Sequence, residues 1–207
     1  MGMLGGMNRF GMSIASMGHD LLELVIGVLT DAVEHRDEGA ECFGKAGLEM
    51  LIIGVLWIYT MSPKSLFILW LAVHGRLSTK DRLMQWGIAT DGVCSLCGVD
   101  PESVQHLFFQ CSYARQVWQK FLQILIINRS SQAFDQELQF AMRMSKKCTA
   151  VSKLLLAGFA EAVYCLWIQR NQRVFAGHVQ SAEQIVKEIV FKVACRCRDS
   201  DIALLLY

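Results

Sequence analysis

The sequence from Cys94 to Cys111, CSLCGVDPESVQHLFFQC, holds four side chains within eighteen residues that can bind a soft metal ion. Cys94 and Cys97 form a C-x2-C pair, and His106 and Cys111 complete the pattern C-x2-C-x8-H-x4-C. The short first spacing allows a tight turn that points both sulfurs at one ion, and Gly98 helps the backbone to turn. Three thiolates and one imidazole are a tetrahedral set that Zn²⁺ favours, with no open position. This pattern predicts a structural zinc site, and the alternative is buried cysteines beside a core histidine.

Helical periodicity surrounds this stretch on both sides, and we find no convincing run of alternating strands. Ser62 and Pro63 predict a helix start, because serine caps free amides and proline fits the first turn. Ser78 with Asp81, and Ser181 with Gln184, resemble capping boxes. We expect helices over residues 21–33, 48–59, 62–74, 78–87, 112–126, 151–175 and 181–198, and one that begins near residue 100. The predicted fold class is therefore mostly α.

Three regions follow from these patterns. Residues 1–56 form an acidic, apolar N-terminal segment, residues 57–120 a small zinc-stabilised helical domain, and residues 121–207 a helical C-terminal region. The short helices near the ligands have little core of their own, so we expect the metal to supply much of their folding free energy.

The composition is apolar, with 53% hydrophobic residues and a mean hydropathy of +0.33. The longest stretch without a charge, residues 50–63, has fourteen residues, fewer than the roughly 20 that a membrane-spanning helix needs. We therefore expect a core helix there and no membrane span. The first twenty residues lack a secretory pattern, so we expect reduced cysteines and an intracellular location, in the nucleus or cytoplasm.

Charge is unevenly distributed along the chain, although the formal net charge is only +1. Residues 1–56 carry a net charge of −5 and residues 112–175 a net charge of +6. The basic excess can meet nucleic-acid phosphates, but a solvated helix face or a surface that docks the acidic segment explains it equally. The candidate phosphate contacts are Lys64, Arg76, Lys80, Arg82, Arg115, Arg170 and Arg173.

Two of these candidates and the nearby aromatic residues have structural explanations as well. Arg170 and Arg173 lie near the end of a predicted helix, where basic side chains complement the helix dipole. Five aromatic residues are expected to form the core of the zinc domain rather than platforms for base stacking: Phe67, Trp70, Trp86, Phe108 and Trp118.

Longer stretches resemble a known family. Residues 62–88, the C-S-L-C-G run from Cys94, the E-S-V-Q-H-L-F-F-Q-C run from Glu102 and the A-R-Q-V-W run from Ala114 are similar to the reverse-transcriptase zinc-binding domain of plant non-LTR (LINE-type) retroelements. The run from Leu166 to Phe175, LWIQRNQRVF, resembles a segment often found downstream in such proteins.

The resemblance implies a module at the C-terminal side of a retroelement polymerase that helps to grip template RNA or target DNA. It also implies that Cys94, Cys97, His106 and Cys111 bind the zinc ion. The chain has no Tyr-x-Asp-Asp element and no acidic set typical of an endonuclease or RNase H. We therefore expect a non-catalytic, nucleic-acid-binding fragment; the alternative is a structural or protein-interaction domain in which zinc only stabilises the fold.

Overall fold

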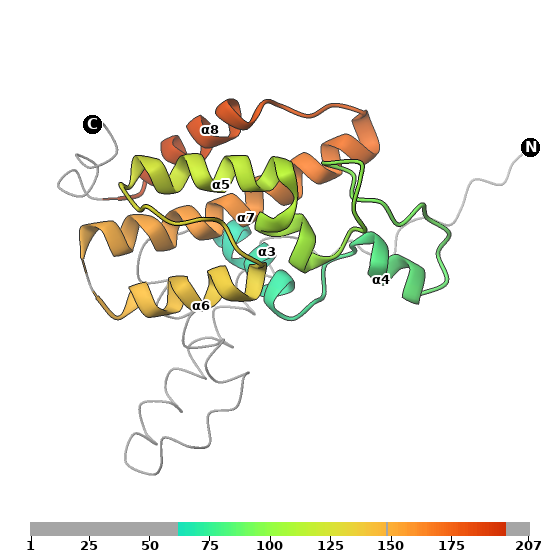
Figure 1. Ribbon diagram of the computed structural model, residues 1–207, viewed down its shortest axis with the longest axis horizontal. Coiled ribbons are helices and arrows are strands. Elements are labelled where there is room, and N and C mark those ends of the chain that lie inside the picture. The colour runs from blue at the N-terminus through green and yellow to red at the C-terminus, as the bar shows by residue number, and fades with distance from the viewer. Residues whose placement is uncertain (1–61, 148, 198–207) are drawn as a thin grey trace, which may run out of the picture. The chain divides into compact units, whose positions relative to one another are not determined.

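The computed structural model describes residues 62–147 and 149–197, which belong to a compact unit spanning residues 55–207 (Figure 1). The predicted segment 1–56 and the helices expected at 21–33 and 48–59 lie outside the described residues. The described helices are α3 (Pro63–Val73), α4 (Lys80–Gln85), η1 (His106–Gln110), α5 (Ser112–Ile124), α6 (Phe134–Ser145), α7 (Ala150–Ala176) and α8 (Ala182–Ala194). One isolated β-bridge joins Val93 to Pro101, so the mostly α prediction is confirmed for this part of the chain.

The 27-residue helix α7 is the centre of the described unit. It contacts α3, α5, α6 and α8, and Figure 1 shows it between α5 and α6. By length and hydropathy α7 could cross a membrane, but 78% of its apolar window is buried inside the protein. An α-helix that is apolar all round is typical of a protein core.

The boundary predicted at residue 120 falls inside α5, and one core covers both sides of it. Gly158 in the middle of α7 allows α5 to approach closely. A Cβ atom at this position would lie 1.9 Å from Cζ of Phe121, far inside van der Waals contact. The glycine therefore leaves space for a buried ring, at some cost in helix propensity.

An aromatic cluster joins the segment after His106 to the helical core. The ring centroid of Phe109 lies 5.0 Å from that of Trp118 and 5.5 Å from that of Phe159. Phe109 has a φ of 77°, which is strained for a residue with a Cβ atom. Its side chain is fully buried, and its carbonyl accepts a hydrogen bond of 2.8 Å from Ser131 Oγ. Burial of the ring thus offsets the strain of the turn.

The helix starts agree only in part with the sequence patterns. The capping box between Ser181 and Gln184 is confirmed at the start of α8. The box expected at Ser78 is wrong, because α4 begins at Lys80 and Thr79 is its N-cap residue. The helix expected near residue 100 does not begin there, because Pro101 is bridged to Val93.

Candidate metal centre

The four predicted ligands converge in the structure. The Sγ atoms of Cys94, Cys97 and Cys111 and a ring nitrogen of His106 all lie within 4.8 Å of one another. The sulfurs of Cys94 and Cys111 are 3.9 Å apart, and Cys97 Sγ lies 3.3 Å from His106 Nε2. Ligands around a tetrahedral zinc ion, with bonds of about 2.0–2.3 Å, are separated by roughly 3.5–3.8 Å. The donor set and its spacing therefore fit one tetrahedral ion.

The turn at the first cysteine pair is held by backbone hydrogen bonds. The Gly98 amide donates to the Cys94 carbonyl at 2.8 Å, and the Cys94 amide donates to the Asp100 carbonyl at 2.7 Å. Gly98 has a φ of 70°, a conformation that glycine adopts without the steric cost of a Cβ atom. This turn brings Cys97 back toward Cys94.

The second half of the site depends on the sharp turn within η1. The backbone is non-helical at Phe108 and Phe109, and the Cys111 amide donates to the His106 carbonyl at 2.7 Å. The other ring nitrogen of His106, Nδ1, lies 3.8 Å from Asp100 Oδ2. This distance is too long for a hydrogen bond, so the Asp100 carboxylate acts on the imidazole through its charge alone.

The two buried thiols differ in how readily they lose a proton. The hydrogen bond from Cys94 to Cys111, followed by burial, raises the pKa of Cys94. The same hydrogen bond lowers the pKa of Cys111, with help from backbone amides at the start of α5. Cys111 is therefore the more acidic thiol of the pair, and Cys94 keeps its proton more firmly. A bound cation favours the thiolates and would displace that proton.

Burial lowers the pKa of His106 and outweighs the opposing charges of Asp100 and Glu102. The lowered value favours the neutral imidazole at neutral pH, which is the form that binds a metal.

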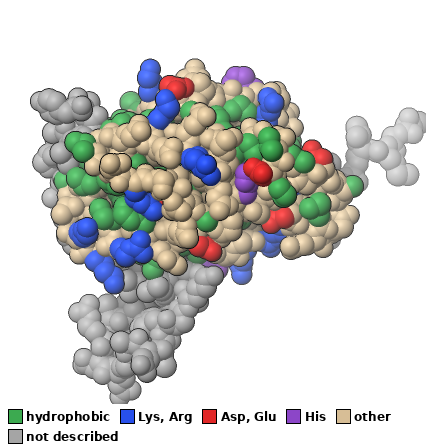
Figure 2. All heavy atoms as spheres, in the orientation of Figure 1, with side chains coloured by type: hydrophobic (Ala, Val, Ile, Leu, Met, Phe, Trp, Pro, Cys, Tyr) green, Lys and Arg blue, Asp and Glu red, His purple; other side chains and the backbone are tan. Residues whose placement is uncertain are grey.

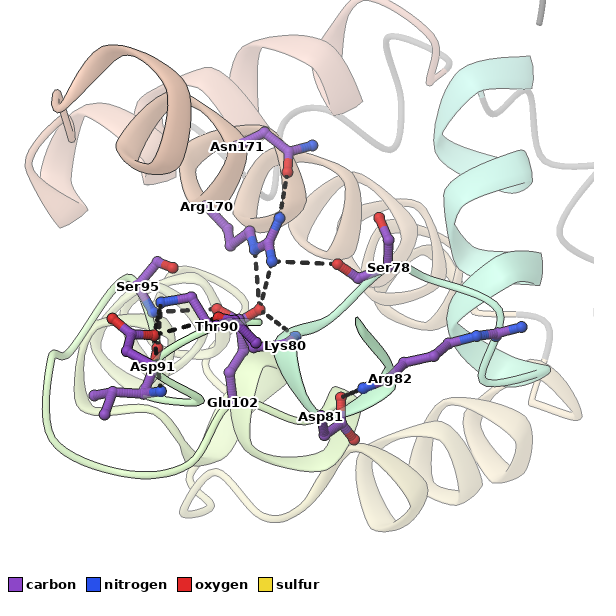
Figure 3. A network of polar contacts seen from close by, with 11 residues as sticks. Ser78, Lys80, Asp81, Arg82, Thr90, Asp91, Ser95, Glu102, Arg170 and Asn171 are labelled. Atoms are coloured by element: carbon purple, nitrogen blue, oxygen red, sulfur yellow. Dashed lines mark hydrogen bonds and ion pairs between the residues drawn. The ribbon is translucent and has the colours of Figure 1, made fainter. Parts of the chain in front are cut away.

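A buried ion pair ties this site to the central helix (Figure 3). Arg170 on α7 donates to Glu102 Oε1 from Nε at 3.0 Å and from Nη2 at 2.7 Å. It also donates to the Ser78 carbonyl at 3.2 Å. Arg170 is 4% exposed and Glu102 is fully buried. A charged pair of this kind is strongly destabilised when one partner is removed.

Glu102 also holds the backbone at the start of α4 and within the first cysteine pair. Its Oε1 accepts from the Lys80 amide at 3.0 Å, and its Oε2 accepts from the Ser95 amide at 3.1 Å. Burial alone would raise the pKa of Glu102, but the hydrogen bonds and charge of Arg170 outweigh it and lower the pKa. Glu102 is therefore an ionised buried anchor between α4, the turn after Cys94 and α7.

Two predicted phosphate contacts have other roles in the structure. Arg170 is buried against Glu102, which contradicts its assignment as a nucleic-acid contact. The helix-dipole explanation of Arg170 also misses its main partner, a carboxylate 68 residues away. Lys80 Nζ donates to Asp91 Oδ1 at 2.6 Å and to the Val93 carbonyl at 2.7 Å, so its charge is used within the loop.

The other five predicted contacts reach solvent. Arg173 is exposed and donates to the Gly177 carbonyl at the end of α7, as the dipole explanation requires. Arg82 is half-buried. The remaining three are exposed: Lys64, Arg76 and Arg115.

The aromatic predictions also divide. Phe108 and Trp118 are fully buried, as expected for the core, whereas Trp86 is 54% exposed and its assignment to the core is wrong. Phe67 and Trp70 are half-buried. Trp86 is the C-cap residue of the six-residue helix α4, which has no buried residue, so periodicity alone could not show that the Trp86 ring faces solvent.

The comparison with known families can now be set beside this geometry. Residues 42–118 match the family described as zinc-binding in reverse transcriptase. By this match, residues 42–118 have the sequence of a reverse-transcriptase zinc-binding domain. All four ligands and Glu102 lie inside the matched region, whereas Arg170 and the rest of α7 lie outside it. No curated protein and no solved structure matches the chain.

The remaining described cysteines do not form a second site. Within residues 62–147 and 149–197, the four converging ligands are the one group of three or more potential metal ligands. Cys165 is 2% exposed, and burial raises its pKa to about 12, so it packs as a small apolar residue. Cys195 is exposed.

Proposed function

We propose that this chain is a non-catalytic, zinc-stabilised nucleic-acid-binding module derived from the reverse transcriptase of a plant non-LTR retroelement. The observation that carries the proposal is the convergence of three sulfurs and one imidazole nitrogen within 4.8 Å, inside a segment of a zinc-binding family. Four protein ligands complete a tetrahedral shell, so a zinc ion there has a structural role and no free position for a substrate.

Basic residues that are exposed or half-buried support the proposed interaction with nucleic acid. Besides Lys64, Arg76, Arg82, Arg115 and Arg173, a second group surrounds the turn between α6 and α7. Figure 2 shows basic side chains gathered at the left of the molecule, where Figure 1 places this turn. We define the α6–α7 basic patch as Arg143, Lys146, Lys147 and Lys153.

The α6–α7 basic patch has little acidic sequence around it, because no Asp or Glu occurs between residues 138 and 160. These four charges are part of the net +6 of residues 112–175, although none of the four residues is among the predicted phosphate contacts. Phosphate contacts of this kind bind nucleic acid with little sequence preference and with strong salt dependence.

Two measurements test the proposal. Native mass spectrometry should find one zinc ion per chain, and Cys97→Ser should reduce that occupancy. Titration of the zinc-loaded chain with single-stranded RNA and with duplex DNA should show affinity that falls steeply as salt is raised. A chain without zinc, or one that binds neither nucleic acid in a salt-dependent manner, would contradict the proposal.

A structural or protein-interaction role is the second candidate. It is favoured by large apolar side chains at the surface, including Ile126 at 90%, Phe175 at 82% and Phe191 at 68% exposure. This role predicts zinc binding without affinity for nucleic acid, together with recovery of a protein partner by the zinc-loaded chain.

The proposed location is a reducing intracellular compartment, the nucleus or the cytoplasm, because the thiol ligands must stay reduced to bind zinc. Imaging of a fluorescent fusion tests the location, and a secreted fusion would contradict it.

A further inference from the structure

A groove next to the metal centre has the chemistry of a site for an unpaired nucleotide. It has a volume of about 450 Å³ and lies between the residues that follow α3, helix α4 and residues 103–105. One wall is therefore adjacent in sequence to His106, and the hydrogen bond of 3.2 Å from the His106 amide to Ser103 Oγ joins this wall to the metal centre. The ligand turn thus holds one side of the groove in place.

The groove presents an aromatic face to solvent. Trp86 lines it and is 54% exposed; it is the C-cap residue of α4, a helix that has no buried residue. The guanidinium carbon of Arg82 lies 4.7 Å from the centroid of the Trp86 ring, so a cation covers one part of the ring. Exposure of so large an aromatic side chain costs burial free energy that a stacked ligand would recover.

Positive charge and hydrogen-bonding groups surround this ring. Arg76 and Arg82 line the groove, with Asp81 as the one carboxylate among the described lining residues. The guanidinium of Arg76 lies 4.9 Å from the ring centroid of Trp70, and Arg82 donates to the Gly75 carbonyl. These contacts hold both arginines at the groove, where their charge can meet a phosphate.

Two amide side chains also line the groove, from Gln85 and Gln105; Gln105 Oε1 accepts a hydrogen bond of 3.2 Å from the Asp135 amide, which leaves its NH₂ group as a donor. An amide side chain can donate to and accept from the edge of a base. Together with Trp86 and the two arginines, the groove offers a stacking face, cationic groups and hydrogen-bonding groups within one small volume. An unpaired nucleotide combines the matching parts, namely a π-face, polar base edges and flanking phosphates.

We propose that this groove, defined by Arg76, Arg82, Gln85, Trp86 and Gln105, binds one unpaired nucleotide of single-stranded RNA or DNA, with its base stacked on Trp86. The inference rests on the proposed nucleic-acid-binding function and specifies its substrate class as single-stranded. A base inside a duplex is covered on both faces by its neighbours and cannot reach the ring without being unpaired.

The test uses the zinc-loaded full chain and three fluorescent probes of equal length: a single-stranded oligonucleotide, the same strand with abasic positions, and a duplex. The wild-type chain should bind the intact single strand more tightly than the abasic strand. Trp86→Ala should weaken binding of the intact strand by between about 5-fold and 100-fold, and should leave binding of the abasic strand almost unchanged. Trp86→Phe should retain most of the affinity.

Matched controls separate stacking from loss of fold. Phe191→Ala removes another exposed aromatic side chain, from α8 (68% exposed), and should have no effect on binding. Zinc stoichiometry and circular dichroism of Trp86→Ala should equal those of the wild type. Arg82→Gln should weaken binding of the intact and abasic strands alike and reduce the salt dependence of both.

The outcomes distinguish this inference from the function on which it rests. If no probe binds in a salt-dependent manner, the nucleic-acid function fails and the groove assignment fails with it. If intact and abasic strands bind equally and Trp86→Ala changes neither, nucleic-acid binding stands and the groove assignment is overturned. Binding of polyglutamate with the same loss in Trp86→Ala would identify an acidic-peptide site and would also overturn it.

Discussion

Replacement of Arg170 by methionine should destabilise the chain far more than a surface substitution does. The change removes two hydrogen bonds to Glu102 and one to the Ser78 carbonyl, and it leaves a fully buried carboxylate without its counter-ion. Removal of one partner from a buried ion pair costs about 3–5 kcal/mol. Because small domains are stable by only about 5–15 kcal/mol, this loss is a large fraction of the total.

Urea denaturation of the zinc-loaded chain at pH 7 measures this loss, which should lower the midpoint by roughly 1–3 M. Arg173→Met is a matched control, since Arg173 is exposed and lies three residues further along the same helix. Its effect should stay within about 0.5 kcal/mol. The double variant Arg170→Met with Glu102→Gln should be more stable than the sum of the single changes predicts, by roughly 1–3 kcal/mol.

Zinc affinity should fall together with stability, because Glu102 accepts the Ser95 amide directly after Cys94. Competition with a chelator should therefore extract zinc from Arg170→Met more readily than from Arg173→Met. The reasoning is refuted if Arg170→Met costs less than about 1 kcal/mol, if it behaves like Arg173→Met, or if the double variant is strictly additive.

The contribution of Glu102 to folding stability should depend on pH with opposite signs in the wild-type chain and in Arg170→Met. In the native chain the pKa of Glu102 lies below its ordinary value of 4.5, so its contribution is present above pH 4.5 and is lost as the pH falls through the folded pKa. Without Arg170, burial is unopposed by that charge and should raise the pKa above 4.5. The loss of unfolding free energy in Arg170→Met, relative to the wild type, should then grow as the pH rises through the raised pKa. This loss should be smaller at pH 5.5 than at pH 7, in buffers that keep zinc bound.

Three further changes test other parts of the structure. Cys97→Ser should weaken zinc binding in native mass spectrometry, whereas Cys195→Ser, at an exposed cysteine outside the site, should leave one ion bound. Gly158→Ala should destabilise the chain by about 1–3 kcal/mol or more in urea denaturation, because its Cβ would meet Phe121 at 1.9 Å. This loss is expected although alanine favours helices more than glycine does. Phe121→Leu should recover part of the loss, and a stabilised alanine variant would contradict the packing. Ser181→Ala should cost about 1 kcal/mol in the same assay because it breaks the capping box of α8, and an unchanged midpoint would count against that cap.

Local signals explain where the sequence predictions succeeded. The ligands of the metal centre lie within eighteen residues, so donor chemistry and spacing were enough to group them. The capping box at Ser181 likewise involves only four consecutive residues. Helix α6 has no counterpart among the predicted helices, because that segment follows a polar loop and lacks a comparable start signal: its N-cap residue, Ala133, makes no side-chain cap.

Contacts between distant residues explain where those predictions failed. Arg170 was predicted to lie at the surface because it is charged, yet the structure buries it. Trp86 was predicted to lie in the core because it is aromatic, yet the structure exposes it. Burial depends on which elements pack together, and short helices such as α4 carry too few turns for periodicity to identify an inner face.

The sequence by itself determined the donor set, the helical class and the zinc-binding family of residues 42–118. These properties depend on residue type at short spacing, which the order of residues states directly. Only the tertiary structure decided that the site is anchored from outside the matched region, by Arg170 on Glu102, and that Phe109 takes a strained turn in order to enter the aromatic core. Both features depend on residues that are far apart in sequence. A buried charge is stable only beside an opposite charge, and a strained turn is stable only when its side chain is packed, and the residues that provide these contacts can come from any part of the chain.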